Sequence, residues 1–360
     1  MPGPHPTLAT LRRHALTRSL FAPTTLARAI ARLGFVQVDP IRAPARAQDL
    51  ILRHRVAGYV AGDLERRYHR LAIEEDFFIN YGFLPRATQA LLHPRAPRRW
   101  WTVARRRQAE PVLAFVRARG VVHPREVDEA FAHGRTRNWF GGSSNASTQL
   151  LDAMRDQGML RVARREGGIR LYAVRESTPP PADPAAAFDA LFDVAIAKYA
   201  PLPVASLGWF ASALVMGAPQ WKAQRTAALR RARARVTTMR VDGVDWCWPA
   251  GERVRDAEPA ARVRLLAPFD PVVWDRRRFE HFWGWAYRFE AYVPARQRVR
   301  GYYALPLLWR DAVIGWANLS VEGGRLVPEF GYVAGRAPRE RAYGAALEEE
   351  LAAMARFLGL

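Results

Sequence analysis

The sequence predicts an α+β protein built from repeated helical units and a β-rich C-terminal part. Two observations carry this prediction: three helices followed by a β-hairpin are expected twice in succession, and strand-like patterns dominate from residue 263 onward. The chain has 360 residues, 49% of them hydrophobic, which is enough for several domains with their own cores.

The first of the two repeats is expected over residues 109–177. Gly120 and Gly158 mark the ends of helices, and a Gly-Gly turn at 167–168 separates two alternating runs. Three helices followed by a hairpin predict a winged helix-turn-helix. The expected elements are helices over 111–119, 124–131 and 145–157, and strands over 160–164 and 169–174.

The second repeat is expected over residues 178–262. A proline-rich joint at 179–181 opens it in an extended conformation, and Asp242-Gly243 is a strong hairpin signal near its end. The same element order predicts another winged helix. The expected helices span 184–199, 204–216 and 221–235, and the expected strands span 236–241 and 244–248.

The two ends of the chain follow other patterns. Residues 1–108 predict a helical region with one short β-like run ended by Pro40, and residues 263–360 predict a compact β-barrel or curled sheet with a closing helix. The expected helices are 8–20, 25–33, 43–59 and 338–360. The expected strands are 35–40, 263–269, 287–293, 298–307, 312–321 and 325–330.

Charge points to a polyanionic partner. The chain carries 55 Lys and Arg against 34 Asp and Glu, a formal net charge of +21, and residues 1–108 alone hold 19 basic and 7 acidic residues. Nucleic acid would be drawn to such a region by counterion release, although a basic surface can also serve solubility alone.

Cysteine count and histidine spacing exclude several kinds of site. The single cysteine, Cys247, excludes a disulfide within the chain and a Cys-rich zinc site, and the eight histidines include no metal-binding helical pair. We therefore expect no metal and no organic cofactor. With neither a signal peptide nor a membrane-spanning segment predicted, we expect a cytoplasmic protein that does not bind membranes.

Three polar clusters of the sequence are candidate sites. The acidic triplets 74–76 and 348–350 are most simply solvated helix faces. Gln37 and Asp39 differ, because alternate residues of an extended run share one face, which places an amide beside a carboxylate while Val36 and Val38 point into the core. Such a pair before a proline is also common where a strand closes into a turn.

These residues belong to blocks that resemble a known family. The run 35–50, FVQVDPIRAPARAQDL, together with 265–271, LLAPFDP, 274–278, WDRRR, 290–294, EAYVP, and 301–306, GYYALP, resembles the winged-helix crosslink-repair DNA glycosylases of the AlkZ and YcaQ type. The resemblance spans essentially the whole chain. It implies three tandem winged helices, over 1–108, 109–177 and 178–262, followed by a β-barrel-like domain over 263–360.

The resemblance also implies a reaction. The family motif is Gln, an apolar residue and then Gln or Asp; Gln37-Val38-Asp39 matches the YcaQ-like form, which implies excision of N7-alkylated purines and unhooking of interstrand crosslinks. The chain departs from the family at 76–82, DFFINYG, where a Tyr-Trp-x-His block is expected, and this leaves the lesion open.

Further site residues follow from position. Arg42, Arg46 and Arg53 have near-helical spacing after the motif, so they are candidate phosphate contacts in double-stranded DNA, or ordinary solvated arginines. Asp270 lies in a block shared with the family and is a candidate DNA contact or a structural turn residue. We expect a monomer, acting as a monofunctional glycosylase because no amine nucleophile lies near the motif in sequence.

Two other functions fit the same sequence. A winged-helix transcriptional regulator would bind one operator and perform no catalysis. A resistance protein specialised for one natural alkylating product would share the chemistry and differ in its lesion pocket. Because a crosslinked base cannot swing freely out of the duplex, the glycosylase hypothesis predicts that Gln37 and Asp39 line a shallow channel.

Overall fold

The computed structural model describes residues 5–96, 101–137, 142–177 and 179–360. These residues form two compact units. The first contains the chain up to Asp63, Phe192–Phe210 and Leu229–Leu360, and the second contains Leu64–Leu191 and Ala211–Ala228. The segment predicted as the third winged helix therefore contributes to both units.

The N-terminal helices of the first unit lie where the sequence predicts them. Threonine side chains cap α1 (Leu8–Ser19) and α2 (Leu26–Leu33). Gly34 ends α2 at φ +67°, and a Cβ at this position would lie 2.7 Å from Cγ1 of Val194. Glycine is therefore required here on both counts, and the chain enters β1 (Val36–Gln37) directly behind it.

The long helix expected over 43–59 is wrong. The helix α3 spans only Ala47–Leu52. Pro44 keeps Ala43 out of a helix because the residue before a proline avoids the helical conformation. Beyond Leu52 the backbone pairs with Thr24 instead: the Arg55 carbonyl accepts the Thr24 N–H at 2.9 Å, and the Ala57 N–H donates to the Thr24 carbonyl at 3.0 Å.

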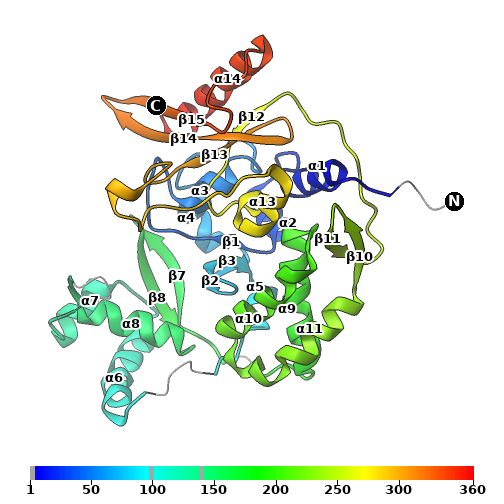
Figure 1. The fold of residues 1–360 in the computed structure, drawn as a ribbon. Coiled ribbons are helices and arrows are strands. Elements are labelled where there is room, and N and C mark those ends of the chain that lie inside the picture. Colours follow the sequence, from blue (N-terminus) through cyan, green and yellow to red (C-terminus); the bar gives the residue numbers. More distant parts are fainter. Residues whose placement is uncertain (1–4, 97–100, 138–141, 178) are drawn as a thin grey trace. The chain divides into compact units, whose positions relative to one another are not determined.

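The C-terminal part is an open sheet and not a barrel. Its four strands pair antiparallel in the order β12-β13-β14-β15, so β12 and β15 are edges, and α14 (Arg341–Leu358) packs on β12 (Figure 1). The predicted barrel is therefore wrong within 263–360, all of which the structure describes. The strands are β12 (Val263–Leu265), β13 (Leu305–Trp309), β14 (Ala312–Glu322) and β15 (Arg325–Tyr332).

A loop replaces the strands predicted between residues 287 and 304. The buried carboxylate of Glu290 accepts the backbone N–H groups of Val299 and Arg300 at 2.9 and 2.7 Å. The Tyr287 hydroxyl donates to the Ala304 carbonyl at 2.7 Å. Side chains therefore satisfy backbone groups that a strand would have paired, and the barrel lacks the strands needed to close. The helices before this loop are α12 (Pro271–Trp274) and α13 (Arg276–Trp283).

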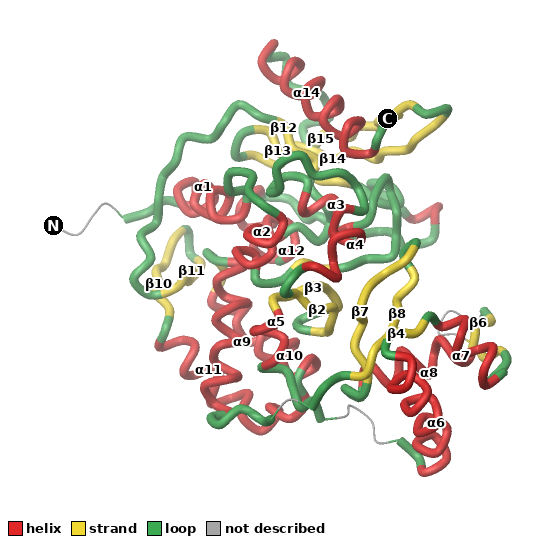
Figure 2. Tube along the Cα trace, turned by 180° about the vertical axis from the view of Figure 1, so that it is seen from behind, coloured by secondary structure: helices red, strands yellow, loops and turns green. Residues whose placement is uncertain are grey.

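The element order of the predicted repeats is present. In the second unit three helices precede the hairpin β7–β8 along the chain, and Figure 2 shows α8 beside this hairpin. Pro111 lies inside α6 because that helix begins at Val103, earlier than predicted. The elements are α6 (Val103–Arg119), β4 (Val121–Val122), α7 (Pro124–Phe131), β5 (Arg135–Arg137), β6 (Ser143–Asn145), α8 (Ala146–Asp156), β7 (Leu160–Glu166) and β8 (Ile169–Val174).

The next segment repeats that order. Its helices α9 (Pro184–Tyr199), α10 (Val204–Gly217) and α11 (Arg225–Ala234) precede the hairpin of β10 (Val236–Val241) and β11 (Val244–Pro249), and β9 (Leu202–Pro203) pairs with β11. The assignment of these segments as winged-helix domains stays a prediction. None of the described helices is long and apolar enough to cross a membrane.

The acidic triplet 74–76 is a buried strand and not a solvated helix face. Glu74, Glu75 and Asp76 lie on β2 (Ile73–Phe77), each at most 3% exposed. Arg165 and Arg95 bind two of them, with Nε of Arg165 at 2.7 Å from Glu75 and Nη1 of Arg95 at 2.8 Å from Asp76. Burial raises the pKa of Glu75, but the charges of Arg165 and Arg170 and the hydrogen bonds from Arg165 and Tyr81 together outweigh it and bring the pKa to about 2. This network lies in the core of the second unit. The same unit contains β3 (Tyr81–Pro85), α5 (Arg86–Ala90) and, from Leu64 onward, α4 (Asp63–Arg67).

Candidate active site

The Gln37 and Asp39 pair lies at the end of a strand whose start is fully buried. Phe35 and Val36 have no exposed surface, while Gln37 and Asp39 are 4% and 7% exposed. Val38, predicted to point into the core, is only partly buried. The alternation therefore places the two polar side chains on the more enclosed face, where their hydrogen bonds fix their position.

The amide of Gln37 is held by an indole from far along the chain. Nε1 of Trp274 donates to Oε1 of Gln37 at 2.7 Å, in the first unit. Because the amide oxygen accepts this bond, the NH₂ group of Gln37 is left as a donor for another partner. Trp274 ends α12, so the position of this short helix sets the position of the amide.

Asp270 sets the start of α12. Its carboxylate accepts the N–H of Val272 at 3.0 Å and receives both terminal nitrogens of Arg55 at 2.7 and 2.9 Å. Asp270 and Arg55 are both fully buried. A DNA contact by Asp270 is therefore not supported. The geometry instead shows a structural role, in which Asp270 caps α12 and binds Arg55.

The Asp39 carboxylate makes one backbone hydrogen bond and, among the described residues, no ion pair. Oδ1 accepts the N–H of Ile41 at 2.9 Å. Burial raises the pKa of Asp39, and the bond from Ile41 offsets this only in part. A carboxylate so enclosed, with no arginine neutralising it, has a charge that acts strongly on nearby groups.

Two tyrosines lie close enough to Asp39 to respond to its charge. The pKa values of Tyr292 and Tyr303 are raised, first by burial and second by the negative charge of Asp39. Tyr292 is 68% exposed, whereas Tyr303 is buried and its hydroxyl has no hydrogen-bond partner in the part of the chain that the structure describes. The loop that replaces the predicted strands thus places two phenols within range of the Asp39 charge.

A buried amine packs against the same strand. Nζ of Lys198 donates to the carbonyl oxygen of Phe35, two residues before Gln37, and the lysine is 7% exposed. Burial, and next the Arg55 charge, lower the pKa of Lys198 to about 7. No sequence pattern indicates this neighbour, because 163 residues separate it from Phe35.

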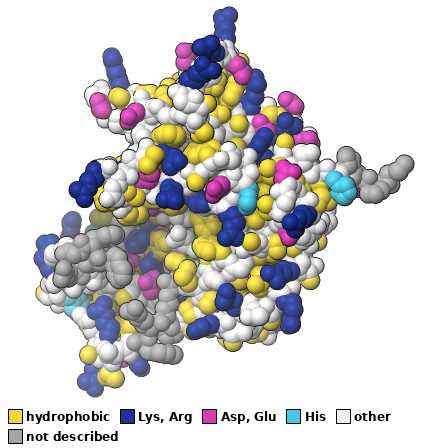
Figure 3. Space-filling view, viewed as in Figure 1, with side chains coloured by type: hydrophobic (Ala, Val, Ile, Leu, Met, Phe, Trp, Pro, Cys, Tyr) yellow, Lys and Arg dark blue, Asp and Glu magenta, His cyan; other side chains and the backbone are white. Residues whose placement is uncertain are grey.

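The three predicted phosphate contacts have different environments. Arg42 is exposed and Arg46 is partly buried at the start of α3. Arg53 is 5% exposed and forms an ion pair with Glu350 of α14, so the phosphate contact predicted for it is not supported. Glu350 is itself buried, and the interpretation of 348–350 as a solvated face fails at this residue. Figure 3 shows Lys and Arg side chains interspersed with acidic ones over the visible face.

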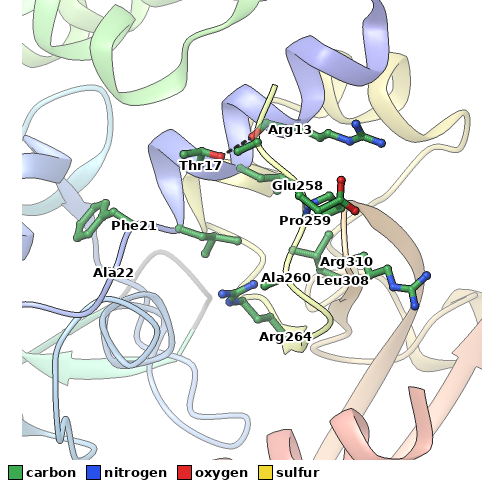
Figure 4. Close-up of a pocket in the computed structure, with 13 residues that line it drawn as sticks. Arg13, Thr17, Phe21, Ala22, Glu258, Pro259, Ala260, Arg264, Leu308 and Arg310 are labelled. Atoms are coloured by element: carbon green, nitrogen blue, oxygen red, sulfur yellow. Dashed lines mark hydrogen bonds between the residues drawn. The ribbon is translucent and has the colours of Figure 1, made fainter. Parts of the chain in front are cut away.

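Two cavities of the first unit are lined by residues other than the candidate pair. One of about 230 Å³ is lined by α1 and by Arg264 and Arg310 (Figure 4), and another of about 330 Å³ is lined by α10, α12 and α13. Neither is lined by Gln37 or Asp39, but Trp274 lines the second. Among the described residues, no group of three or more His, Cys, Asp or Glu side chains is arranged to hold a metal ion.

Comparison with known proteins places the chain in a class of enzymes. The family model described as "DNA glycosylase AlkZ-like" matches residues 30–357. The chain therefore belongs to the AlkZ-like DNA glycosylase family, as the sequence blocks around Gln37 predict. Among solved structures, the chain is similar to the Streptomyces sahachiroi DNA glycosylase AlkZ, with a TM-score of 0.62 and 15% identity over 99% of this chain and 98% of that one. At 15% identity, this structural similarity supports a shared fold only.

Sequence reasoning missed Trp274, Tyr292 and Tyr303 as neighbours of the motif. All three lie in blocks that carry the family resemblance, so the signal was present as a clustering of aromatic residues in those blocks. Nothing in the sequence indicates which of these aromatic residues meets Gln37 or Asp39, since that depends on long-range folding.

Proposed function

We propose that this protein hydrolyses the N-glycosidic bond of N7-alkylated purines in double-stranded DNA and unhooks interstrand crosslinks formed at that position. The observation that carries the proposal is the Asp39 carboxylate, enclosed, free of an ion pair among the described residues and adjacent to the fixed amide of Gln37. Membership of a DNA glycosylase family supports DNA as the substrate.

The reaction requires stabilisation of the positive charge that develops on the sugar. Alkylation at N7 gives the purine a positive charge, which makes the base a good leaving group without a strong general acid. As the bond breaks, C1′ acquires oxocarbenium character, and a nearby carboxylate stabilises this charge and orients the attacking water. Asp39 performs this role, and the NH₂ group of Gln37 holds the water or a sugar oxygen.

The reaction ends at the abasic site. A β-lyase needs an amine that can reach C1′, and the nearby amine, Lys198, is buried and bonded to the Phe35 carbonyl. We therefore propose a monofunctional enzyme. Borohydride added during the reaction should trap no covalent complex with DNA.

One assay tests this function. Duplexes with a single 7-methylguanine or a nitrogen-mustard crosslink are incubated with the full chain and treated with alkali, which cleaves abasic sites. The protein should generate cleavage at 7-methylguanine and separate the crosslinked strands. Asp39→Asn keeps the shape and removes the charge, and should lower the single-turnover rate by about 10² to 10³.

A matched variant guards against a loss caused by charge alone. Asp245→Asn makes the same change at an exposed hairpin position and should leave the rate unchanged. Wild-type excision by the Asp39→Asn variant would remove Asp39 from the mechanism. DNA left intact by the wild type, with tight binding to one sequence, would favour a regulator instead.

A further inference from the structure

An aromatic cavity adjoins the candidate active site through a shared side chain. The cavity, of about 330 Å³, lies in the first unit, and its aromatic lining is Trp209, Phe210 and Trp274. Its polar lining includes Ser206, Asp275 and Arg277. Binding sites for small ligands begin at about this size and combine a mostly apolar wall with a few polar groups.

Trp209 is half exposed although it contacts two other aromatic rings. Trp209 meets Trp274 edge-on, with ring centroids 4.8 Å apart and an interplanar angle of 71°, and meets Phe210 at 5.4 Å and 84°. Phe210 is 1% exposed, whereas Trp209 is 49% exposed. These two rings therefore cover only part of the Trp209 side chain, and about half of it is exposed where it lines the cavity.

The carboxylate in the cavity is already satisfied. Oδ2 of Asp275 accepts the Ser206 hydroxyl at 2.7 Å, and Oδ1 accepts the backbone N–H groups of Arg277 and Arg278, both at 3.1 Å. Because these hydrogen bonds satisfy the carboxylate of Asp275, the cavity does not favour a cation as its ligand. Its remaining character is aromatic, with the exposed Arg277 beside it as a group able to meet a phosphate.

Trp274 joins this cavity to the candidate catalytic pair. Its indole lines the cavity, and its N–H donates to Gln37 at 2.7 Å. A ring bound in the cavity would contact the same side chain that orients the amide, so its occupant and the reacting nucleotide would be neighbours.

We propose that this cavity receives a nucleobase unstacked from the DNA duplex, with its ring against Trp209. The proposal rests on the proposed function, because that function brings DNA to Gln37. A base is the occupant that we infer because every DNA lesion site supplies one, whereas only some adducts carry an aromatic substituent. Stacking on an aromatic side chain tolerates any base, since each has a π-face.

The test uses binding and does not depend on catalysis. The full chain is titrated with a fluorescent duplex that carries one bulged, unpaired adenine and with the fully paired duplex. The wild type should prefer the bulged duplex by about tenfold, the scale of one base stacked on an aromatic side chain. Trp209→Ala should abolish this preference, Trp209→Phe should keep most of it, and Val321→Ala, at another exposed apolar position, should not change it.

Each outcome separates the two proposals. Equal binding of both duplexes by the wild type, or a preference that survives Trp209→Ala, would overturn the inference. A Trp209-dependent preference in a protein that excises no 7-methylguanine would support the base site and reject the glycosylase. If Trp209→Ala slows only the excision of 7-benzylguanine and leaves the bulge preference intact, the cavity binds the adduct's own ring, and the base site is wrong.

Discussion

The indole N–H of Trp274 and the amide oxygen of Gln37 lie 2.7 Å apart although 237 residues separate them in the chain. Trp274 is the last residue of α12, Asp270 caps the start of that helix, and the fully buried Arg55 binds Asp270. A buried ion pair, a short helix and an indole therefore determine, in that order, how the candidate catalytic amide is oriented.

Removing the indole N–H should weaken catalysis without removing the ring. Trp274→Phe leaves Oε1 of Gln37 without its donor, so the amide can rotate, and we expect single-turnover excision of 7-methylguanine to fall about tenfold. Trp283→Phe removes a similar bond, from Nε1 to the Asp311 carbonyl at 3.0 Å, and is the matched control. Equal rates for the two variants would contradict a positioning role for Trp274.

The acid limb of the activity should lie at higher pH than an ordinary aspartate gives. Burial raises the pKa of Asp39, so the carboxylate takes up its proton earlier as the pH falls, and the protonated form does not stabilise an oxocarbenium ion. Single-turnover rates measured from pH 4 to pH 8 should begin to fall at a higher pH than an aspartate with the usual pKa near 3.9 would give. A flat profile down to pH 4 would speak against Asp39 as the acting group.

The arginines after the motif should divide into two classes. If Arg42 and Arg46 contact phosphates, Arg42→Gln and Arg46→Gln should each reduce the slope of log binding constant against log salt by about 0.9. Arg53→Gln should leave the slope unchanged and lower the free energy of unfolding by about 3 to 5 kcal/mol, because it leaves Glu350 buried without its partner. Salt titrations and denaturant unfolding measure the two effects, and a slope altered by Arg53→Gln would reverse its assignment.

The buried pair of Arg55 and Asp270 should matter more than any exposed pair. Asp270→Asn leaves the Arg55 charge uncompensated in the interior, and we expect it to lower the free energy of unfolding by about 3 to 5 kcal/mol and to slow excision through α12. Asp245→Asn breaks an exposed pair with Arg240 and should change stability by less than about 1 kcal/mol. Comparable denaturation midpoints for the two variants would contradict this ranking.

Lys198 should make stability rise with pH. Its pKa is about 7 in the folded chain and near 10.5 when unfolded, so between these values the unfolded state binds one proton more than the folded state. The free energy of unfolding of the wild type should therefore increase relative to that of Lys198→Met by about 1.4 kcal/mol per pH unit between pH 8 and pH 10. A constant difference between the two proteins over that range would show that Lys198 does not titrate there.

Local sequence patterns were sufficient to predict much of the secondary structure and to recognise the motif of the family. The helices near Leu8 and Leu26, the hairpin at Asp242-Gly243 and the repeated order of three helices and a hairpin all depend on caps, turns and periodicity over a few residues. The family resemblance, which the match over residues 30–357 confirms, likewise rests on short blocks of sequence.

Long-range packing decided what those local patterns could not. Arg53 and Asp270 read as exposed polar residues, but the folded chain buries each against a charge that lies 297 and 215 residues away in sequence. The strands expected between residues 287 and 304 are a loop, because buried side chains accept or replace the backbone hydrogen bonds that strands would make. Burial and the pairing of charges are properties of the whole fold, so only the tertiary structure could place Trp274 on Gln37 and leave Asp39 enclosed without a counterion among the described residues.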